Sequence, residues 1–127
     1  MDMRERAMRL ADELLPESNC NKRQVTFVVY NEHEILDWGV NLHPTGKPCF
    51  CKPGVHDRHV SHAEEILRGK RYPGASAVVT YAPCLEHECA QLIKAAGIVR
   101  LDVKEIKHTD GVNYLTDNGI AVFNEWI

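Results

Sequence analysis

The sequence predicts an α/β fold in which a mixed five-stranded sheet is the middle one of three layers, with helices on both faces. Residues 2–15 place apolar side chains at helical spacing, which predicts a first amphipathic helix. Two short apolar segments, 23–30 and 35–40, flank a tight turn and predict a pair of strands. From residue 61 onward, strand-like and helix-like segments alternate, which is typical of parallel strands joined by right-handed crossovers. We therefore expect a single domain over residues 1–127.

The first helix is expected to cover one face of the sheet and to end at Pro16. Its methionines, Met3 and Met8, are interpreted as core filling, because a thioether side chain adapts to irregular gaps. The strands at 23–30 and 35–40 should be antiparallel, since only a short turn joins them.

Each later element has its own boundary signal. Ser61 is a favourable N-cap for a helix over Ala63 to Arg68, and Glu64 follows at capping-box spacing. Pro73 and Gly74 precede a β-branched strand at 75–81. The remaining expected elements are a helix over 89–96 ended by Gly97, a strand over 98–103, a helix over 111–118 capped by Asp110 and ended by Gly119, and a strand over 120–123.

Composition excludes several functional classes. The chain is 44% hydrophobic and 26% charged, an ordinary balance for a soluble domain, and has no apolar run of the roughly 18 residues that a membrane span needs. Its charged first residues do not resemble a signal peptide, so we expect a cytoplasmic enzyme with no membrane partner. The net charge of −3 argues against sequence-independent nucleic-acid binding. Five cysteines are an odd number, which favours metal ligands or reduced thiols over a disulfide framework.

A metal and general-base pattern occupies the segment from Ser61 to Cys89. It opens with His62-Ala63-Glu64 and closes with Cys84 and Cys89. One imidazole and two thiolates suit a tetrahedral zinc and leave its fourth position open for water. Zinc lowers the pKa of bound water, and Glu64, two residues from the His ligand, can carry protons. Thiolates at the start of the helix over 89–96 would also be favoured by the helix dipole. This order of residues is the signature of zinc nucleobase deaminases.

The spacing of the cysteines leaves the identity of the third metal ligand undecided. Four residues separate Cys84 from Cys89, whereas the signature has two, and His87 stands where the second cysteine would fall. Either Cys89 or His87 could be the third ligand, since imidazole also suits zinc. We prefer Cys89, because the sequence after it keeps the register of the signature and the two additional residues then lengthen a turn.

With these residues the chain resembles the cytidine and deoxycytidylate deaminase superfamily. The resemblance covers about residues 23 to 123, and its specific part is the zinc motif. Within the superfamily, Gly39 to Pro44 resembles the Gly-x-Asn-x-x-Pro segment of deoxycytidylate (dCMP) deaminases, whereas Ile66-Leu67 departs from their usual Asn and small residue. The resemblance implies a cytidine-deaminase-like fold, a catalytic zinc, and hydrolysis of a cytosine mononucleotide, dCMP, to dUMP and ammonia.

The resemblance also implies how the substrate is held. Asn41 would contact the sugar, and the backbone at Ala63 and Ala82 would hold the edge of the base. Among the basic residues near the motif, Arg58 is our candidate for the 5′-phosphate, because it lies four residues before His62. Relatives commonly assemble, so a homo-oligomer is expected by analogy.

A second metal site is an open alternative in the long irregular segment from Asn41 to Val60. Unstructured loops of this length are usually functional or held in place. The resemblance suggests a structural zinc there, as in some phage-type relatives. Such a zinc could be bound by Cys49, Cys51, His56 and His59, with Cys20 as a possible remote ligand. In the alternative interpretation the histidines are exposed and the cysteines are small buried hydrophobes.

Two other functions stay open at this point. The first is a deaminase for a nucleoside, a free base, a modified cytosine nucleotide or an adenosine in transfer RNA. The second is a non-catalytic module that zinc stabilises and that binds a nucleotide or a protein. Glu64 argues against the second, because a purely structural site gains nothing from a general base beside the metal.

Overall fold

A computed structural model describes residues 2–18, 24–42 and 62–126. Short apolar stretches bounded by proline, glycine and capping residues form its elements, as the pattern of the sequence predicts. In chain order they are α1 (Met3–Leu14), η1 (Leu15–Glu17), β1 (Thr26–Tyr30), β2 (Ile35–Val40), η2 (Ala63–Leu67), β3 (Ser76–Tyr81), α2 (Cys89–Ala95), β4 (Arg100–Glu105), α3 (Asp110–Asp117) and β5 (Ala121–Phe123); η1 and η2 are 3₁₀ helices.

The sheet has the strand order β2-β1-β3-β4-β5. Strand β1 is antiparallel to both β2 and β3, whereas β3, β4 and β5 run parallel to one another. The prediction of a mixed five-stranded sheet is thus confirmed, including the antiparallel first pair. The carboxyl ends of β3 and β4 therefore lie at the same edge, where ligands of parallel sheets usually bind.

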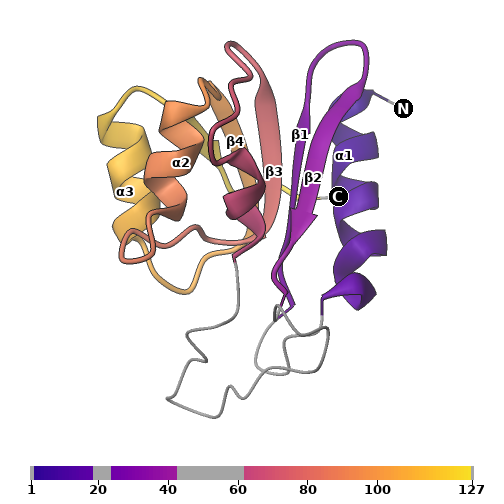
Figure 1. The fold of residues 1–127 in the computed structure, drawn as a ribbon, viewed down its shortest axis with the longest axis horizontal. Helices are drawn as coiled ribbons and strands as arrows, with labels where there is room; N and C mark the ends of the chain where they lie inside the picture. The colour runs from indigo at the N-terminus through magenta and orange to yellow at the C-terminus, as the bar shows by residue number, and fades with distance from the viewer. Residues whose placement is uncertain (1, 19–23, 43–61, 127) are drawn as a thin grey trace.

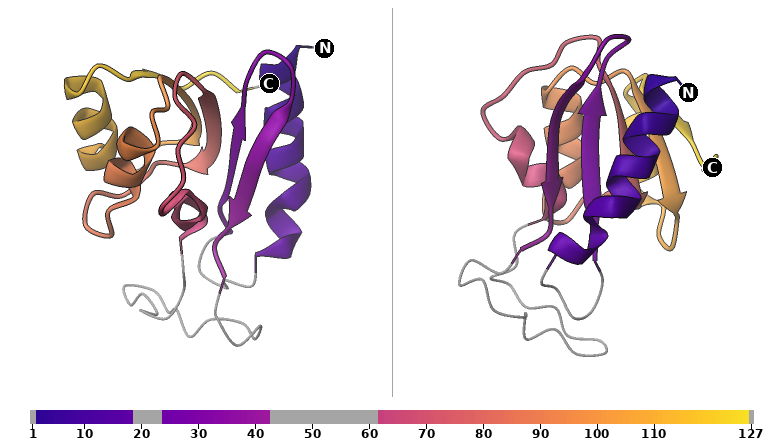
Figure 2. Two further views of the ribbon diagram at one scale, coloured as in Figure 1. Left: turned by 45° about the horizontal axis from the view of Figure 1, so that its top comes forward. Right: turned by 90° about the vertical axis from the view of Figure 1, so that its right-hand side faces the viewer.

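Helix α1 covers one face of the sheet (Figure 1). Ala7, Met8 and Ala11 are fully buried and pack against Val28 of β1 and Val78 of β3. This confirms Met8 as a core residue, and the partly buried Met3 packs on the same cluster. The side views in Figure 2 also place α1 on the face opposite to the other helices.

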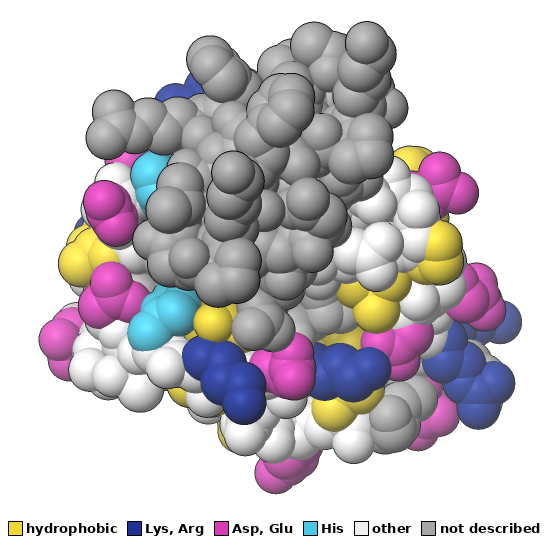
Figure 3. Space-filling model, turned by 90° about the horizontal axis from the view of Figure 1, so that it is seen from below, with side chains coloured by type: hydrophobic (Ala, Val, Ile, Leu, Met, Phe, Trp, Pro, Cys, Tyr) yellow, Lys and Arg dark blue, Asp and Glu magenta, His cyan; other side chains and the backbone are white. Residues whose placement is uncertain are grey.

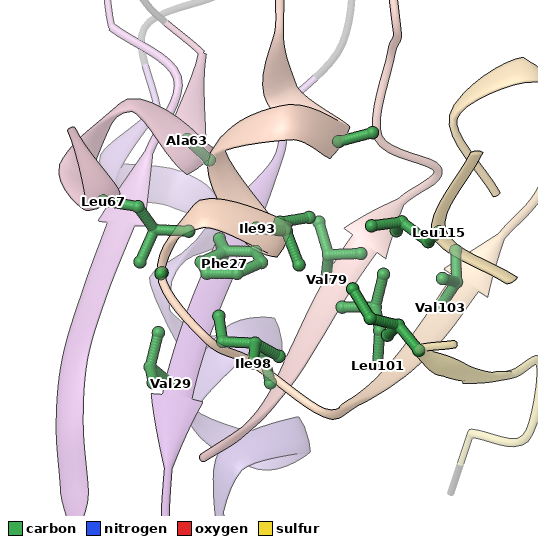
Figure 4. Close-up of a cluster of buried hydrophobic side chains, with 14 of the residues drawn as sticks. Phe27, Val29, Ala63, Leu67, Val79, Ile93, Ile98, Leu101, Val103 and Leu115 are labelled. Atoms are coloured by element: carbon green, nitrogen blue, oxygen red, sulfur yellow. The ribbon is translucent and has the colours of Figure 1, made fainter. Parts of the chain in front are cut away.

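The opposite face is covered by η2, α2 and α3 and holds the larger core (Figures 1 and 4). Phe27 of β1 and Val79 of β3 face Ile93 of α2 and Leu115 of α3, and all four side chains are fully buried. Helices thus lie on both faces, which confirms the three layers. In the part of the chain that the structure describes, no helix is long and apolar enough to cross a membrane.

Two helix starts differ from the predictions. The segment after residue 61 is one short 3₁₀ helix capped at His62, and Glu65, rather than Glu64, accepts the hydrogen bond from the backbone N–H of His62 at 2.7 Å. The prediction of a Ser61 cap paired with Glu64 was therefore wrong by one residue. Helix α3 begins at Asp110 and not after it, because Thr109 is its cap. In η2, both Glu64 and Glu65 could complete a capping box, so the sequence alone does not decide which residue is the N-cap.

Candidate metal centre and active site

The imidazole of His62 is positioned by the start of η2. Its backbone donates to the carboxylate of Glu65, and the N–H of Glu65 donates back to the carbonyl oxygen of His62 at 3.0 Å. This reciprocal pair fixes the first turn of the helix and therefore the direction in which His62 leaves the backbone. Glu64, the next residue but one, then points into the core and is only 3% exposed.

The turn between β3 and α2 supplies the two thiols. Cys84 follows Pro83 at the end of β3, and Cys89 is the first residue of α2. The N–H of Ala90 donates to the carbonyl of Cys84 at 3.0 Å and closes the turn. Glu88, just before the helix, has φ of 67°, a left-handed conformation that few non-glycine residues adopt. Only Cys89 lies at a helix N-terminus, so the expectation that both thiols do so was wrong for Cys84.

The three side chains converge into one cluster of donors. Nδ1 of His62 is 3.3 Å from Sγ of Cys89 and 3.8 Å from Sγ of Cys84, and the two sulfurs are 3.2 Å apart. All potential ligand atoms lie within 4.8 Å of one another. One nitrogen and two sulfurs at such distances fit a tetrahedral zinc with one position not supplied by the protein. Segments more than twenty residues apart thus form one metal centre.

Protonation of the cluster also suits a metal. Without a cation, the thiol of Cys89 and the ring of His62 lower the pKa of Cys84 by hydrogen bonding. The neighbouring Cys84 and burial raise the pKa of Cys89. The Cys84 thiol therefore loses its proton more readily than the Cys89 thiol. A bound cation would favour the ionised form of both, because metal ligation requires thiolates.

The geometry favours Cys89 over His87 as the third ligand. Cys89 is fully buried, whereas His87 is exposed and does not belong to the group of converging donors. The ring of His87 instead stacks on that of His62, with centroids 4.8 Å apart and planes inclined by 35°. The two additional residues therefore lengthen the turn without displacing the second cysteine.

Glu64 is a buried carboxyl group beside these donors. Burial raises its pKa to about 7. A carboxyl group that can gain or lose a proton near neutral pH is suited to general acid and base catalysis. The arrangement therefore combines a metal centre with a proton carrier, which is what hydrolytic removal of an amine requires.

The predicted substrate-binding residues lie in different environments. Ala63 and Ala82 are buried, and the N–H of Ala82 already donates to the carbonyl of Glu105 at 2.9 Å. Contact of the Ala63 and Ala82 backbone with a base stays a prediction. The side-chain oxygen of Asn41 accepts hydrogen bonds from the N–H of Val25, at 2.8 Å, and from the hydroxyl of Ser18. Asn41 thus holds the end of β2, and its contact with a sugar stays a prediction.

Two glycines near the site make close contacts that the sequence did not indicate. A Cβ atom on Gly39 would lie 2.5 Å from the carbonyl oxygen of Ala63, and one on Gly111 would lie 2.0 Å from that of Pro83. These glycines let β2 and α3 approach the two metal-bearing segments closely. The resemblance marks Gly39 as part of a motif, but no local signal in the sequence indicates a role for Gly111.

The other candidates fall outside the described residues. They are Arg58 and the five residues proposed for a second zinc, namely Cys20, Cys49, Cys51, His56 and His59.

Comparison with known proteins supports this interpretation of the site. The family model of the cytidine and deoxycytidylate deaminase zinc-binding region matches residues 1–105, which include all the donors and Glu64. A search of curated proteins found no match.

Solved structures share the fold over nearly the whole chain. The dCMP deaminase of cyanophage S-TIM5, in complex with dCMP and dUMP, has a TM-score of 0.81 and 26% identity, with 98% of this chain and 96% of that chain covered. Its apo form has a TM-score of 0.76 and 25% identity, with 95% of each chain covered.

A diaminohydroxyphosphoribosylaminopyrimidine deaminase/5-amino-6-(5-phosphoribosylamino)uracil reductase from Thermotoga maritima is a further match. Its TM-score is 0.65 at 25% identity, with 94% of this chain but 34% of that chain covered. The matching region, the fold and the geometry of the donors agree, and this chain belongs to the cytidine and deoxycytidylate deaminase zinc-binding family.

Proposed function

We propose that the protein hydrolyses dCMP to dUMP and ammonia. The observation that carries this proposal is the buried Glu64 carboxyl group beside the cluster of His62, Cys84 and Cys89. The nucleotide is proposed because a solved dCMP deaminase with dCMP and dUMP bound has the same fold over almost all of both chains.

In this proposal Glu64 carries the protons of the reaction. Zinc, when bound, supplies a nucleophile from water at neutral pH. Glu64 takes one proton from this water and gives it to N3 of the cytosine ring. It then takes the remaining proton of the hydroxyl group added at C4 and gives it to the departing amine. The bond between C4 and the exocyclic nitrogen breaks, and a C4–O bond replaces it. A pKa near neutrality suits both the acceptance and the donation of a proton.

The remaining contacts belong to the same proposal. Asn41 contacts the sugar, the backbone of Ala63 and Ala82 holds the edge of the base, and Arg58 contacts the phosphate. Homo-oligomeric assembly and a cytoplasmic location are proposed with them. For the second zinc, elemental analysis decides: about two zinc ions per chain would support it, and about one would contradict it.

The central test is release of ammonia from dCMP by the zinc-loaded protein. Glu64→Gln keeps the size of the side chain but cannot carry protons, so turnover should fall by at least about a hundredfold. Its zinc content should not change, because Glu64 is not a ligand. Glu86→Gln is the matched control, since Glu86 lies exposed in the adjacent turn. Full activity of Glu64→Gln would contradict the proposed mechanism.

A further inference from the structure

Most described cations near the metal centre are already paired with carboxylates. Arg68, at the end of η2, lies 3.6 Å from Glu65 and 3.8 Å from Glu88. It bridges the two segments that carry the metal ligands, so its charge is shared between two acids. A phosphate group would have to compete with both of them. Arg68 is therefore a poor candidate for binding the phosphate of a nucleotide.

The basic residues that follow Arg68 in the chain lie away from the metal centre. Lys70 lies 2.9 Å from Asp37, half-way along β2. The chain then reaches the amino end of β3, where the N–H of Tyr72 donates to the carbonyl of Ala96 at the end of α2. The metal ligands lie at the opposite, carboxyl end of β3. Neither Lys70 nor its neighbour Arg71 is placed to reach a substrate there.

The loop between β4 and α3 lies beside the metal-bearing turn. Strands β3 and β4 stay paired up to Tyr81 and Glu105, where both strands end. The first turn of α3 then packs so closely on the backbone of Pro83 that a Cβ atom on Gly111 would not fit. Loops at the carboxyl ends of neighbouring parallel strands commonly form one ligand site. This loop carries Lys107 and His108.

His108 is held in one orientation by two neighbours. Its Nδ1 lies 2.9 Å from a carboxylate oxygen of Asp110, and its ring meets the ring of Tyr81 nearly edge-on, with centroids 5.5 Å apart. Asp110 is itself fixed, because it also accepts the N–H of Gly111 at 2.9 Å. The other ring nitrogen, Nε2, then points away from Asp110. The side chain of His108 is 37% exposed, so a ligand can reach it.

One exposed cation of this loop can assist in binding an anion. Lys107 is exposed directly beside His108. With Nδ1 of His108 bound to the carboxylate of Asp110, Nε2 is the ring nitrogen left for a ligand. Figure 3, which looks onto this end of the molecule, shows histidine side chains there among both acidic and basic ones.

We propose that His108, oriented by Asp110, binds the 5′-phosphate of the nucleotide. The inference rests on the proposed function, since it concerns the same substrate. His108 is then a specificity residue that distinguishes dCMP from deoxycytidine, and Asp110 is a positioning residue that acts through it.

The test compares kcat/KM for dCMP and for deoxycytidine, which lacks only the phosphate. In His108→Ala the preference for dCMP should fall roughly tenfold to a hundredfold, as expected for loss of one hydrogen bond between charged groups, and mainly through KM. His108→Arg should retain much of it, because Arg also binds phosphate. His33→Ala is the matched control, since His33 lies exposed in the β1–β2 turn at the other end of the sheet. Zinc content and melting temperature verify that each variant is folded.

The outcomes separate this inference from the proposed function. A wild-type protein that deaminates dCMP, together with a His108→Ala variant whose preference changes less than about twofold, would overturn the role of His108 alone. A wild-type protein without activity on dCMP would overturn the proposed function and this inference with it. Binding of dUMP, measured by calorimetry, gives a second readout: His108→Ala should weaken it, and unchanged affinity would contradict the inference.

Discussion

At the scale of single residues, the site depends on one carboxyl group that the fold keeps away from water. Glu64 is 3% exposed, and burial raises its pKa from 4.5 to about 7. The same burial makes its ionised form costly, because little solvent remains to stabilise the charge. Glu64 therefore contributes to the proposed chemistry at the expense of stability when no metal is bound.

This cost predicts a pH-dependent stability of the zinc-free protein. Since the pKa is about 7 in the folded state and 4.5 in the reference state, the penalty is absent below about pH 4.5, grows as the pH rises, and is complete above about pH 7. Glu64→Gln, which cannot ionise, should stabilise the chelator-treated protein by up to about 3 kcal/mol at high pH and by almost nothing at low pH. Urea unfolding at both pH values measures this. An equal effect at the two pH values would show that burial does not shift the pKa of Glu64.

At the scale of elements, the site is built where helices approach strand ends unusually closely. Gly111 brings the first turn of α3 against the backbone of Pro83, and Gly39 brings β2 against the start of η2. In each contact, an element without metal ligands packs directly on a segment that carries them. The position of the donors therefore depends on packing as well as on the local turns.

Gly111→Ala should displace α3 from the metal-bearing turn. Its Cβ would lie 2.0 Å from the oxygen of Pro83 and 2.8 Å from its carbonyl carbon, and the backbone cannot move away as a flexible side chain could. We expect a loss of stability of roughly 1–3 kcal/mol, as for overpacked cores, and weaker zinc binding. Asn113→Ala on the exposed side of α3 is the control. Competition with a zinc-chelating dye would measure the affinity, and wild-type affinity in Gly111→Ala would contradict this account.

At the scale of the whole molecule, a buried charge joins distant parts of the chain. Asp102 of β4 is fully buried, and its carboxylate accepts hydrogen bonds from Arg4 of α1 at 3.1 Å and from Arg100 at 3.1 Å. The guanidinium of Arg4 also donates to the backbone carbonyl of Glu125 near the end of the chain. This network ties α1, β4 and the C-terminal segment together at the end of the sheet away from the metal centre.

Asp102→Ala should destabilise the protein by about 3 kcal/mol. Removing a buried partner leaves two guanidinium groups without their carboxylate, but both are partly exposed and water can compensate in part. The control is Asp12→Ala, which removes a more exposed pair with Lys104 and a hydrogen bond from Nε1 of Trp126, and should cost about 1–2 kcal/mol. Chemical denaturation would measure both variants, and similar losses for the two would contradict the role of the network.

The sequence by itself determined the order and type of the elements and the identity of the metal donors. Helical and alternating apolar periodicities are local properties, so α1, β2 and β3 were predicted to within about two residues. The donors were also predictable, because the chemistry of a zinc site restricts its residue types and the motif fixes their order. Helix caps were less certain, since several residues in a row can accept the same hydrogen bond.

Only the tertiary structure decided how these segments meet. It showed that Cys89 rather than His87 converges with His62, that Cys84 lies outside the helix, and that Asp110 and Tyr81 orient His108. It also revealed the buried carboxylate of Asp102. The convergence of Cys89 with His62 and the contact of Tyr81 with His108 depend on residues far apart in the chain. Such contacts follow from the packing of helices against a sheet, which no local pattern encodes.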